Sequence, residues 1–154
     1  MGAGPPLPGA ACRGRILVVE DDAEIRTGLA HQLERAGYRV FVATGVKDAR
    51  LRLRTAVPDL VLLDLGLPDG SGLDLLDELR CDERGELVPV VVLTASDPAE
   101  SKRPCLRGGA QVFLQKPLRG RELIDAIAKL IAPRGPGRLG PFDWRPSTDR
   151  GQGW

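Results

Sequence analysis

Five short apolar runs alternate with segments of helical periodicity along this chain, and that alternation limits its possible folds more than any other feature. The runs are rich in Val, Leu and Ile, as strands buried on both faces are. They occupy residues 16–19, 40–43, 60–63, 88–93 and 112–114. Strands that alternate with helices form a parallel sheet covered by those helices. The sequence therefore predicts an α/β protein with a five-stranded, doubly wound sheet.

Four of the intervening segments carry a single apolar stripe at helical spacing. The stripes comprise Ile25, Leu29, Leu33 and Ala36; Val46, Ala49, Leu53 and Ala56; Leu73, Leu76 and Leu79; and Leu123, Ile127, Leu130 and Ile131. Gly37 is placed to end the first of these helices, and Ser71 with Asp74 forms a capping pair at the start of the third.

The remaining helix, between residues 98 and 108, contains an interior proline. A proline is tolerated in the first turn of a helix. Counted from Pro98, Pro104 lies beyond that turn. An interior proline removes a hydrogen bond and clashes with the preceding turn, which costs about 3 kcal/mol or more. We therefore expect a broken helix, irregular over 99–103 and regular, if at all, only from about 104 to 107.

Length and composition fit one globular domain. The chain has 154 residues, of which 42% are hydrophobic, and its formal net charge of +1 argues against a general nucleic-acid binder. Segments 1–14 and 133–154 are rich in Gly and Pro and are expected to be flexible, which leaves a folded domain over 15–132.

The sequence also predicts a cytoplasmic protein with free thiols. No apolar run is long enough to span a membrane, and the first residues lack the pattern of a signal peptide. Cys12, Cys81 and Cys105 are far apart and stand at no metal-ligand spacing, so neither a disulfide framework nor a zinc site is expected.

Reactive residues follow the predicted strands. Because the carboxyl ends of parallel strands meet at one edge of a sheet, where ligands bind, these side chains are expected to converge. They are Asp21, Asp22, Asp64, Thr94 and Lys116. Asp59, Asp69 and Asp97 stand before a strand or beside turn residues and are interpreted as structural.

The converging set is chemically suited to phosphoryl transfer. Carboxylates that face one another favour a hard divalent cation, and few protein ligands favour Mg²⁺. Asp64, which ends a buried run, is the candidate nucleophile for an acyl phosphate. Lys116 and Thr94 would meet the phosphoryl oxygens. Each residue also has a plain structural explanation: Asp21 and Asp22 as helix caps, Thr94 as a strand-end hydroxyl and Lys116 as a solvated cation. His31, the single histidine, is interpreted as a surface residue.

Four motifs, in this order and spacing, resemble the receiver domain of two-component response regulators. They are VVEDD (18–22), LDLGLPDG (63–70), LTA (93–95) and KP (116–117), and the resemblance covers residues 14 to 132. It implies the flavodoxin-like (βα)5 fold with strand order 2-1-3-4-5, and phosphorylation of Asp64 by the phosphohistidine of a sensor histidine kinase or a histidine phosphotransfer protein.

The resemblance also implies further roles at the site. Asp22 and Asp64 would bind Mg²⁺ directly, Asp21 would bind it through water, and Gly66 would lend its backbone carbonyl. Thr94 and Phe113 would act as switch residues, and the Lys116–Pro117 bond would be cis. A downstream effector protein would recognise the surface of the fourth helix, fifth strand and fifth helix, without direct nucleic-acid or membrane binding by this chain.

Two departures and three rival functions accompany this interpretation. Pro104 interrupts the helix beside the switch, and Gln111 replaces an acidic residue of the usual dimer contact. A haloacid-dehalogenase-type phosphohydrolase would need a second acid at the position of Gly66. A phosphorylation-independent interaction module would usually lack one of the site residues. The chain could also be the front of a longer regulator with a DNA-binding domain. The expected protein is thus a signalling domain and not an enzyme.

Overall fold

The computed structural model describes residues 12–95, 98–116 and 120–131, with the backbone alone described for 98–102 and 120. It contains a five-stranded parallel sheet in the order β2-β1-β3-β4-β5. The strands are β1 (Arg15–Val19), β2 (Arg39–Ala43), β3 (Leu60–Asp64), β4 (Val90–Thr94) and β5 (Val112–Gln115). The helices are α1 (Ala23–Arg35), α2 (Val46–Thr55), α3 (Gly72–Cys81), α4 (Pro98–Arg107) and α5 (Gly120–Leu130). The predicted fold class and strand order are confirmed.

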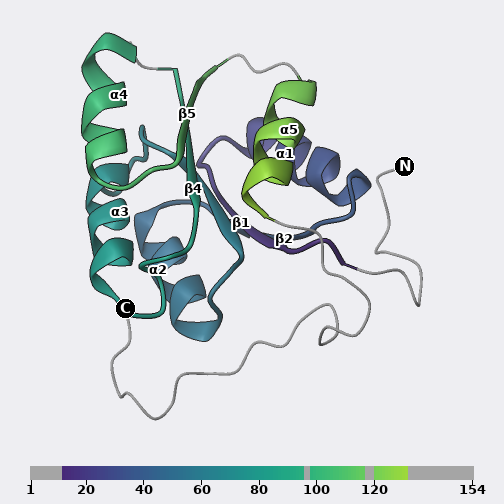
Figure 1. The fold of residues 1–154 in the computed structure, drawn as a ribbon, viewed down its shortest axis with the longest axis horizontal. Helices are drawn as coiled ribbons and strands as arrows, with labels where there is room; N and C mark the ends of the chain where they lie inside the picture. Colours follow the sequence, from purple (N-terminus) through teal and green to yellow (C-terminus); the bar gives the residue numbers. More distant parts are fainter. Residues whose placement is uncertain (1–11, 96–97, 117–119, 132–154) are drawn as a thin grey trace.

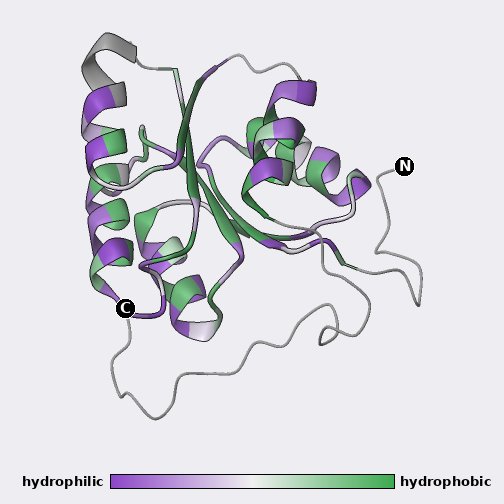
Figure 2. Cartoon of the chain, viewed as in Figure 1, coloured by the Kyte–Doolittle hydropathy of each residue, from purple (hydrophilic) through white to green (hydrophobic). Residues whose placement is uncertain are grey.

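The helices form a layer on each face of the sheet, with α1 and α5 on one side and α2, α3 and α4 on the other (Figure 1). Side chains of successive strand residues point to opposite faces, so β1 feeds two cores: Leu17 packs on the α2–α3 side and Ile16 on the α1–α5 side. The strands are hydrophobic along most of their length, and the helices are hydrophobic mainly toward the sheet (Figure 2). Burial on both faces explains the continuous apolar runs.

Two helices end in the same glycine motif. After α1, Gly37 adopts φ +102°, while the N–H groups of Gly37 and Tyr38 donate to the carbonyls of Glu34 and Leu33. Only glycine adopts this backbone conformation without strain. The predicted helix end at Gly37 is confirmed, and so is the predicted start of α3, where the Ser71 hydroxyl accepts the N–H of Leu73 at 3.1 Å.

The predicted break in the fourth helix is wrong, because α4 runs through Pro104 as one helix (Figure 1). The proline removes a single hydrogen bond, and the end of the helix is held elsewhere. The side chain of Cys105 is fully buried. The N–H of Gly108 donates to the Pro104 carbonyl, the N–H of Ala110 donates to that of Cys105, and Gly109 takes φ +101°. Packing and capping thus offset the lost bond.

Residues 12–14, expected within a flexible segment, are packed instead. Cys12 is 4% exposed and its thiol donates to the carbonyl of Gly14 at 3.2 Å. The backbone N–H of Arg13 donates to the carbonyl of Gly37, and its guanidinium donates to that of Ala36. These residues therefore tie the start of β1 to the end of α1, a long-range contact that composition does not reveal. The rest of the predicted flexible ends, residues 1–11 and 133–154, lies outside the described residues.

Two further expectations concern the thiols and membrane insertion. Cys12, Cys81 and Cys105 are all free, as predicted. Among the described residues, no helix combines the length and apolar character needed to cross a bilayer.

Replacing Pro104 tests the conclusion that α4 stays continuous despite the hydrogen bond that its interior proline removes. Pro104→Ala restores the missing N–H within a continuous helix and is expected to raise the free energy of unfolding by about 1–3 kcal/mol. Urea denaturation measures this change. Pro98→Ala is the matched control, because proline is tolerated in the first helical position and its removal should bring no such gain. An unchanged or lower stability for Pro104→Ala would contradict the assignment.

Candidate functional site

The carboxyl edge of the sheet holds the candidate site. Asp64 ends β3 and Thr94 ends β4, while Glu20 and Lys116 directly follow β1 and β5. Strand pairing continues into both following residues: the N–H of Glu20 donates to the Ala43 carbonyl at 3.0 Å, and that of Lys116 to the Thr94 carbonyl at 2.9 Å. The sheet itself therefore fixes the backbone from which these side chains project.

Three carboxylates form a compact group at this edge. Glu20, Asp21 and Asp64 each contribute an oxygen, and these oxygens lie within 4.8 Å of one another. Glu20 is 2% exposed and Asp64 is 7% exposed, whereas Asp21 faces solvent. The group lies between β1 and β3, where the strand order changes direction and where ligands bind in open α/β sheets.

Lys116 supplies the positive charge of the group. Its Nζ donates to Glu20 Oε1 at 2.6 Å and lies 3.6 Å from Asp64 Oδ2. Burial by itself lowers the pKa of Lys116, but the hydrogen bond to Glu20 and the charge of Asp64 outweigh that effect and raise the pKa. The ammonium group is therefore protonated and is held mainly by Glu20.

Glu20 has a raised pKa, first because burial disfavours its charged form. The hydrogen bonds from Lys116 and from the Asp22 backbone lower this pKa, and the negative charge of Asp64 raises it again. One lysine thus compensates two buried carboxylates only in part. An oxygen-only donor set with excess negative charge suits a hard divalent cation such as Mg²⁺.

The loop after β3 is anchored around Asp64. The N–H of Gly66 donates to Asp64 Oδ1 at 3.2 Å. Asp69, interpreted from sequence as structural, caps α2 from this loop by accepting the N–H groups of Val46 and Lys47 at 2.8 and 3.0 Å. These two hydrogen bonds lower the pKa of Asp69, the one from Lys47 first. The cap therefore fastens the loop to α2.

Gly72 is a site-supporting residue that the sequence reasoning missed. A Cβ atom at Gly72 would lie 2.9 Å from the carbonyl oxygen of Asp64, closer than real Cβ contacts. Any larger residue would displace the backbone that presents the Asp64 carboxylate. The sequence signal was only an ordinary glycine in the first turn of a helix.

Thr94 and Phe113 lie on the last two strands, Thr94 at the carboxyl end of β4 and Phe113 within β5. Thr94 is 1% exposed at the end of β4. Phe113 pairs in register with Val92 and packs, partly buried, against the core on the α2–α3 side. Both residues stand where the sequence placed them. Pro117, and with it the predicted cis bond, lies outside the described residues.

Asp22 does not join the acidic group, and this corrects the sequence-based geometry. Its carboxylate accepts the N–H groups of Glu24 and Ile25 at 2.9 and 3.1 Å and so caps α1. Glu20, which the sequence reasoning treated as part of the strand motif alone, takes the expected place. A shift of one residue at the end of β1 changes which acids face the carboxyl edge of the sheet. Sequence spacing does not fix the end of a strand to within one residue.

The guanidinium of Arg26 fixes the turn of the chain that directly follows β1. Its Nη1 donates to the carbonyls of Glu20 and Asp21 at 2.9 and 3.2 Å. His31, on the same helix, is exposed, as predicted.

The capping role of Asp22 predicts a specific pattern of stability. Asp22→Ala removes the acceptor of two N–H groups and is expected to lower the free energy of unfolding by about 1 kcal/mol. Asp22→Asn keeps an acceptor oxygen at the cap and should stay close to the wild type. Urea denaturation compares the two variants. Equal losses in both would mean that the charge, and not the cap, is what matters.

Comparison with known proteins assigns the family. The family model of the response regulator receiver domain matches residues 16–128 of this chain. The phosphate regulon transcriptional regulatory protein PhoB of Pseudomonas aeruginosa is 37% identical over 122 residues, which cover 79% of this chain and 53% of that protein. The KDP operon transcriptional regulatory protein KdpE of Escherichia coli is 42% identical over 108 residues, which cover 70% of this chain and 47% of that protein. The chain thus spans about half the length of these relatives.

Solved structures give the same result. A putative response regulator from Chloroflexus aurantiacus superimposes with a TM-score of 0.74 at 28% identity, over 77% of this chain and 98% of that one. The chemotaxis protein CheY4 of Vibrio cholerae gives 0.72 at 26% identity, over 79% of this chain and 99% of that one.

Proposed function

The chain belongs to the response-regulator receiver domain family, and on that premise we propose that Asp64 accepts a phosphoryl group in a Mg²⁺-dependent reaction. The donor is the phosphohistidine of a sensor histidine kinase or of a histidine phosphotransfer protein. The product is an aspartyl phosphate that signals to a downstream effector protein. The chain acts in this scheme as a signalling domain that assists its own phosphorylation and dephosphorylation.

The arrangement of Asp64 carries the proposal. Its carboxylate is 7% exposed, ends a strand buried on both faces, and lies within reach of two further acids and of one lysine. A nucleophile must be held in a fixed position, and a rigid strand end does this better than a loop. Lys116 is bound at 2.6 Å to Glu20 and stands 3.6 Å from Asp64. The strand therefore orients Asp64, while Lys116 is bound mainly to Glu20.

The donor set fits Mg²⁺ with one change from the sequence-based assignment. Glu20, Asp21 and Asp64 would hold the ion together with the Gly66 carbonyl, and Asp22 would take no part, because its carboxylate caps α1. When bound, Mg²⁺ would neutralise the negative charge that builds up on the phosphoryl oxygens.

The transfer step follows from the side chains of the chain. A carboxylate oxygen of Asp64 attacks the phosphorus, an O–P bond forms, and the P–N bond of the phosphohistidine breaks. The electron pair of that bond returns to the imidazole, which then takes up a proton. Lys116 lends positive charge to the phosphoryl oxygens, and the Thr94 hydroxyl donates a hydrogen bond to them.

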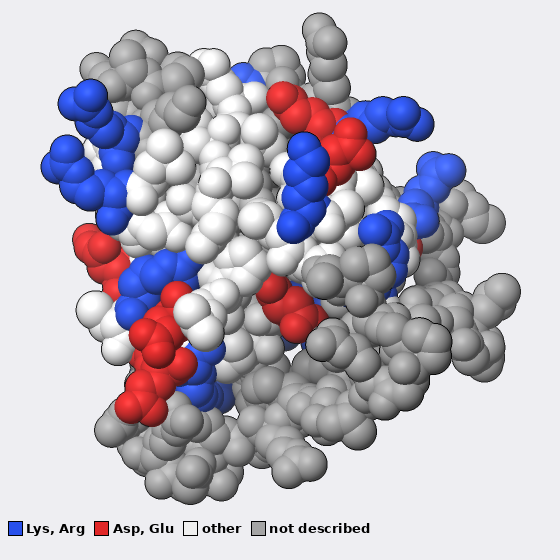
Figure 3. All heavy atoms as spheres, in the orientation of Figure 1, with Lys and Arg blue, Asp and Glu red and all other residues white. Residues whose placement is uncertain are grey.

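Recognition by the effector would involve the surface of α4, β5 and α5. Thr94 would move toward the phosphoryl group and Phe113 would follow it inward. The charge added at Asp64 would thereby change the surface of α4, β5 and α5. Partial burial of Phe113 against the core supports this role, because the ring has an apolar position to enter. On the face drawn in Figure 3, acidic and basic residues are interspersed, which fits the proposal that this chain does not itself bind nucleic acid.

The rival functions find less support. A phosphohydrolase of the haloacid-dehalogenase type needs a second acid two residues after the nucleophile, and that position is the exposed Gly66. A module that has lost phosphorylation would usually lack one of the reactive side chains, and here Asp64, Thr94 and Lys116 stand together at one edge. The curated relatives are transcriptional regulators about twice as long, so an output domain beyond this chain belongs to the proposal as well.

Phosphorylation of Asp64 is tested by intact mass after incubation with Mg²⁺ and acetyl phosphate. The wild type is expected to gain one base-labile phosphate, and Asp64→Asn none, because an amide is not a nucleophile. Asp74→Asn, which changes an exposed acid in the first turn of α3, is the matched control and should label normally. Equal labelling of the wild type and Asp64→Asn would refute the assignment of the phosphoacceptor.

The corrected metal ligands are tested by Mg²⁺ titration calorimetry on two neighbouring variants. Asp21→Asn removes a carboxylate from the acidic group and is expected to weaken Mg²⁺ binding on the order of tenfold or more. Asp22→Asn removes an equal charge one residue away and should change the affinity little. The reverse result would restore the ligand set that the sequence predicted.

A further inference from the structure

A second concave site lies at the opposite, amino-terminal edge of the sheet. It is a cavity of about 250 Å³ between the first residues of β1 and β2, the last turn of α2 and the segment that leads to β3. Its lining includes Arg15, Leu17, Phe41, Arg52, Ala56 and Val57. Its volume is slightly below the usual range of ligand pockets, which limits an occupant to the size of a small fragment.

The floor of the cavity is apolar. Leu17 and Phe41 are register partners on β1 and β2 and therefore point to the same face of the sheet. Leu17 is 2% exposed, while Phe41 and Val57 are only partly buried against the same core. Part of this apolar surface is exposed to solvent, so its burial under the apolar part of a ligand would be favourable.

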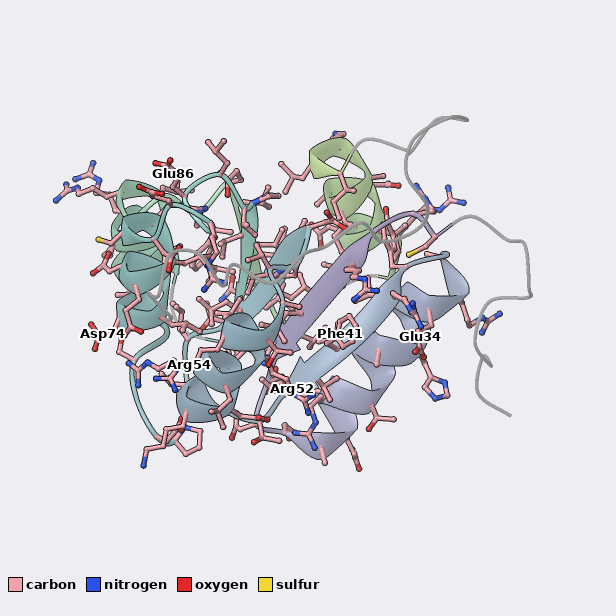
Figure 4. All side chains as sticks on the ribbon, turned by 90° about the horizontal axis from the view of Figure 1, so that it is seen from below. Glu34, Phe41, Arg52, Arg54, Asp74 and Glu86 are labelled. Atoms are coloured by element: carbon pink, nitrogen blue, oxygen red, sulfur yellow. The ribbon has the colours of Figure 1, made fainter. Side chains whose placement is uncertain are left out.

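The rim of the cavity is positively charged. The Arg15 guanidinium stacks 5.2 Å from the centre of the Phe41 ring, and Arg52 reaches the same space from α2 (Figure 4). The described lining contains these two arginines and no acidic residue. The hydroxyl of Thr55, also in the lining, donates to the Leu51 carbonyl of its own helix.

Two acids, Asp48 and Asp59, lie near these arginines. Asp48 lies 3.7 Å from Arg52, but the Arg52 side chain is 51% exposed and can turn toward the cavity. Asp59 accepts the backbone N–H of Arg15 at 2.8 Å. The next cation along the edge is Arg39, the register partner of Arg15. Arg15, Arg52 and Arg39 together carry more charge than Asp48 and Asp59, and this excess of positive charge favours an anion.

We propose that this cavity binds a small carboxylate that carries an aromatic or short aliphatic body. The body would cover Leu17 and Phe41, and the carboxylate would take hydrogen bonds from the guanidinium groups of Arg15 and Arg52. An inorganic anion would leave the apolar floor uncovered, and an organic cation would meet two like charges. The site lies at the other end of the strands from Asp64, so the proposal does not depend on phosphorylation.

The probe is 3-phenylpropanoate, with 3-phenylpropanamide as its neutral match, titrated into the ¹⁵N-labelled full chain and followed by NMR. The carboxylate is expected to shift the backbone amides of Leu17, Phe41 and Val57 with a dissociation constant on the order of 0.1–1 mM. The amide should bind at least about threefold more weakly, because it forms no ion pair.

Two variants locate the binding within the cavity. Arg52→Gln removes an exposed charge and should weaken binding of the carboxylate about three- to fivefold, with little effect on the amide. Ala56→Leu fills the cavity and should weaken both. Arg35→Gln, in the last turn of α1 on the other face, is the matched control and should bind like the wild type. Each variant must first show a wild-type spectrum without ligand.

Any one of three results would overturn the proposal. One is the absence of shifts in the wild type at 10 mM of probe, on the order of ten times the weakest expected dissociation constant. Another is equal affinity for the carboxylate and the amide. The last is wild-type affinity in both Arg52→Gln and Ala56→Leu, which would place the ligand elsewhere.

Discussion

The central constraint in this structure is the burial of like charges at one edge of a parallel sheet. Glu20 and Asp64 are almost fully enclosed and share one lysine, Lys116, so burial raises the pKa of Glu20 while the lysine is held in place by its two acidic neighbours. Much of the surrounding structure serves this arrangement. Strand pairing fixes Glu20 and Lys116, Arg26 holds the turn after β1, and Gly72 leaves room for the Asp64 backbone.

The two edges of the same sheet have opposite electrostatic character. The carboxyl edge gathers acids around Asp64, whereas the amino edge places Arg15 and Arg39 side by side in register. Parallel strands make this separation possible, because every strand delivers its first residues to one edge and its last residues to the other. One scaffold can thus attract a cation at one end and, as proposed above, an organic anion at the other.

Two expectations drawn from local sequence rules are wrong because other contacts outweigh those rules. Pro104 should break a helix by its own propensity, yet the buried Cys105 and the glycine motif after it keep α4 continuous. Asp22 follows a strand like the other reactive acids, yet its carboxylate caps α1 and Glu20 turns to the acidic group. Both differences amount to a few kcal/mol or less, which is the scale on which tertiary packing decides.

The sequence by itself determined the α/β class, the number of strands and the convergence of Asp64, Thr94 and Lys116 on one edge. Run length, apolar period and strand direction are local properties, and parallel topology then brings all strand ends together. Only the tertiary structure decided which acid after β1 joins Asp64, which residue caps α2 and whether α4 stays whole. Those outcomes depend on contacts between segments far apart in the chain, such as Asp69 with Val46, whose energies rival the local preferences that sequence patterns express.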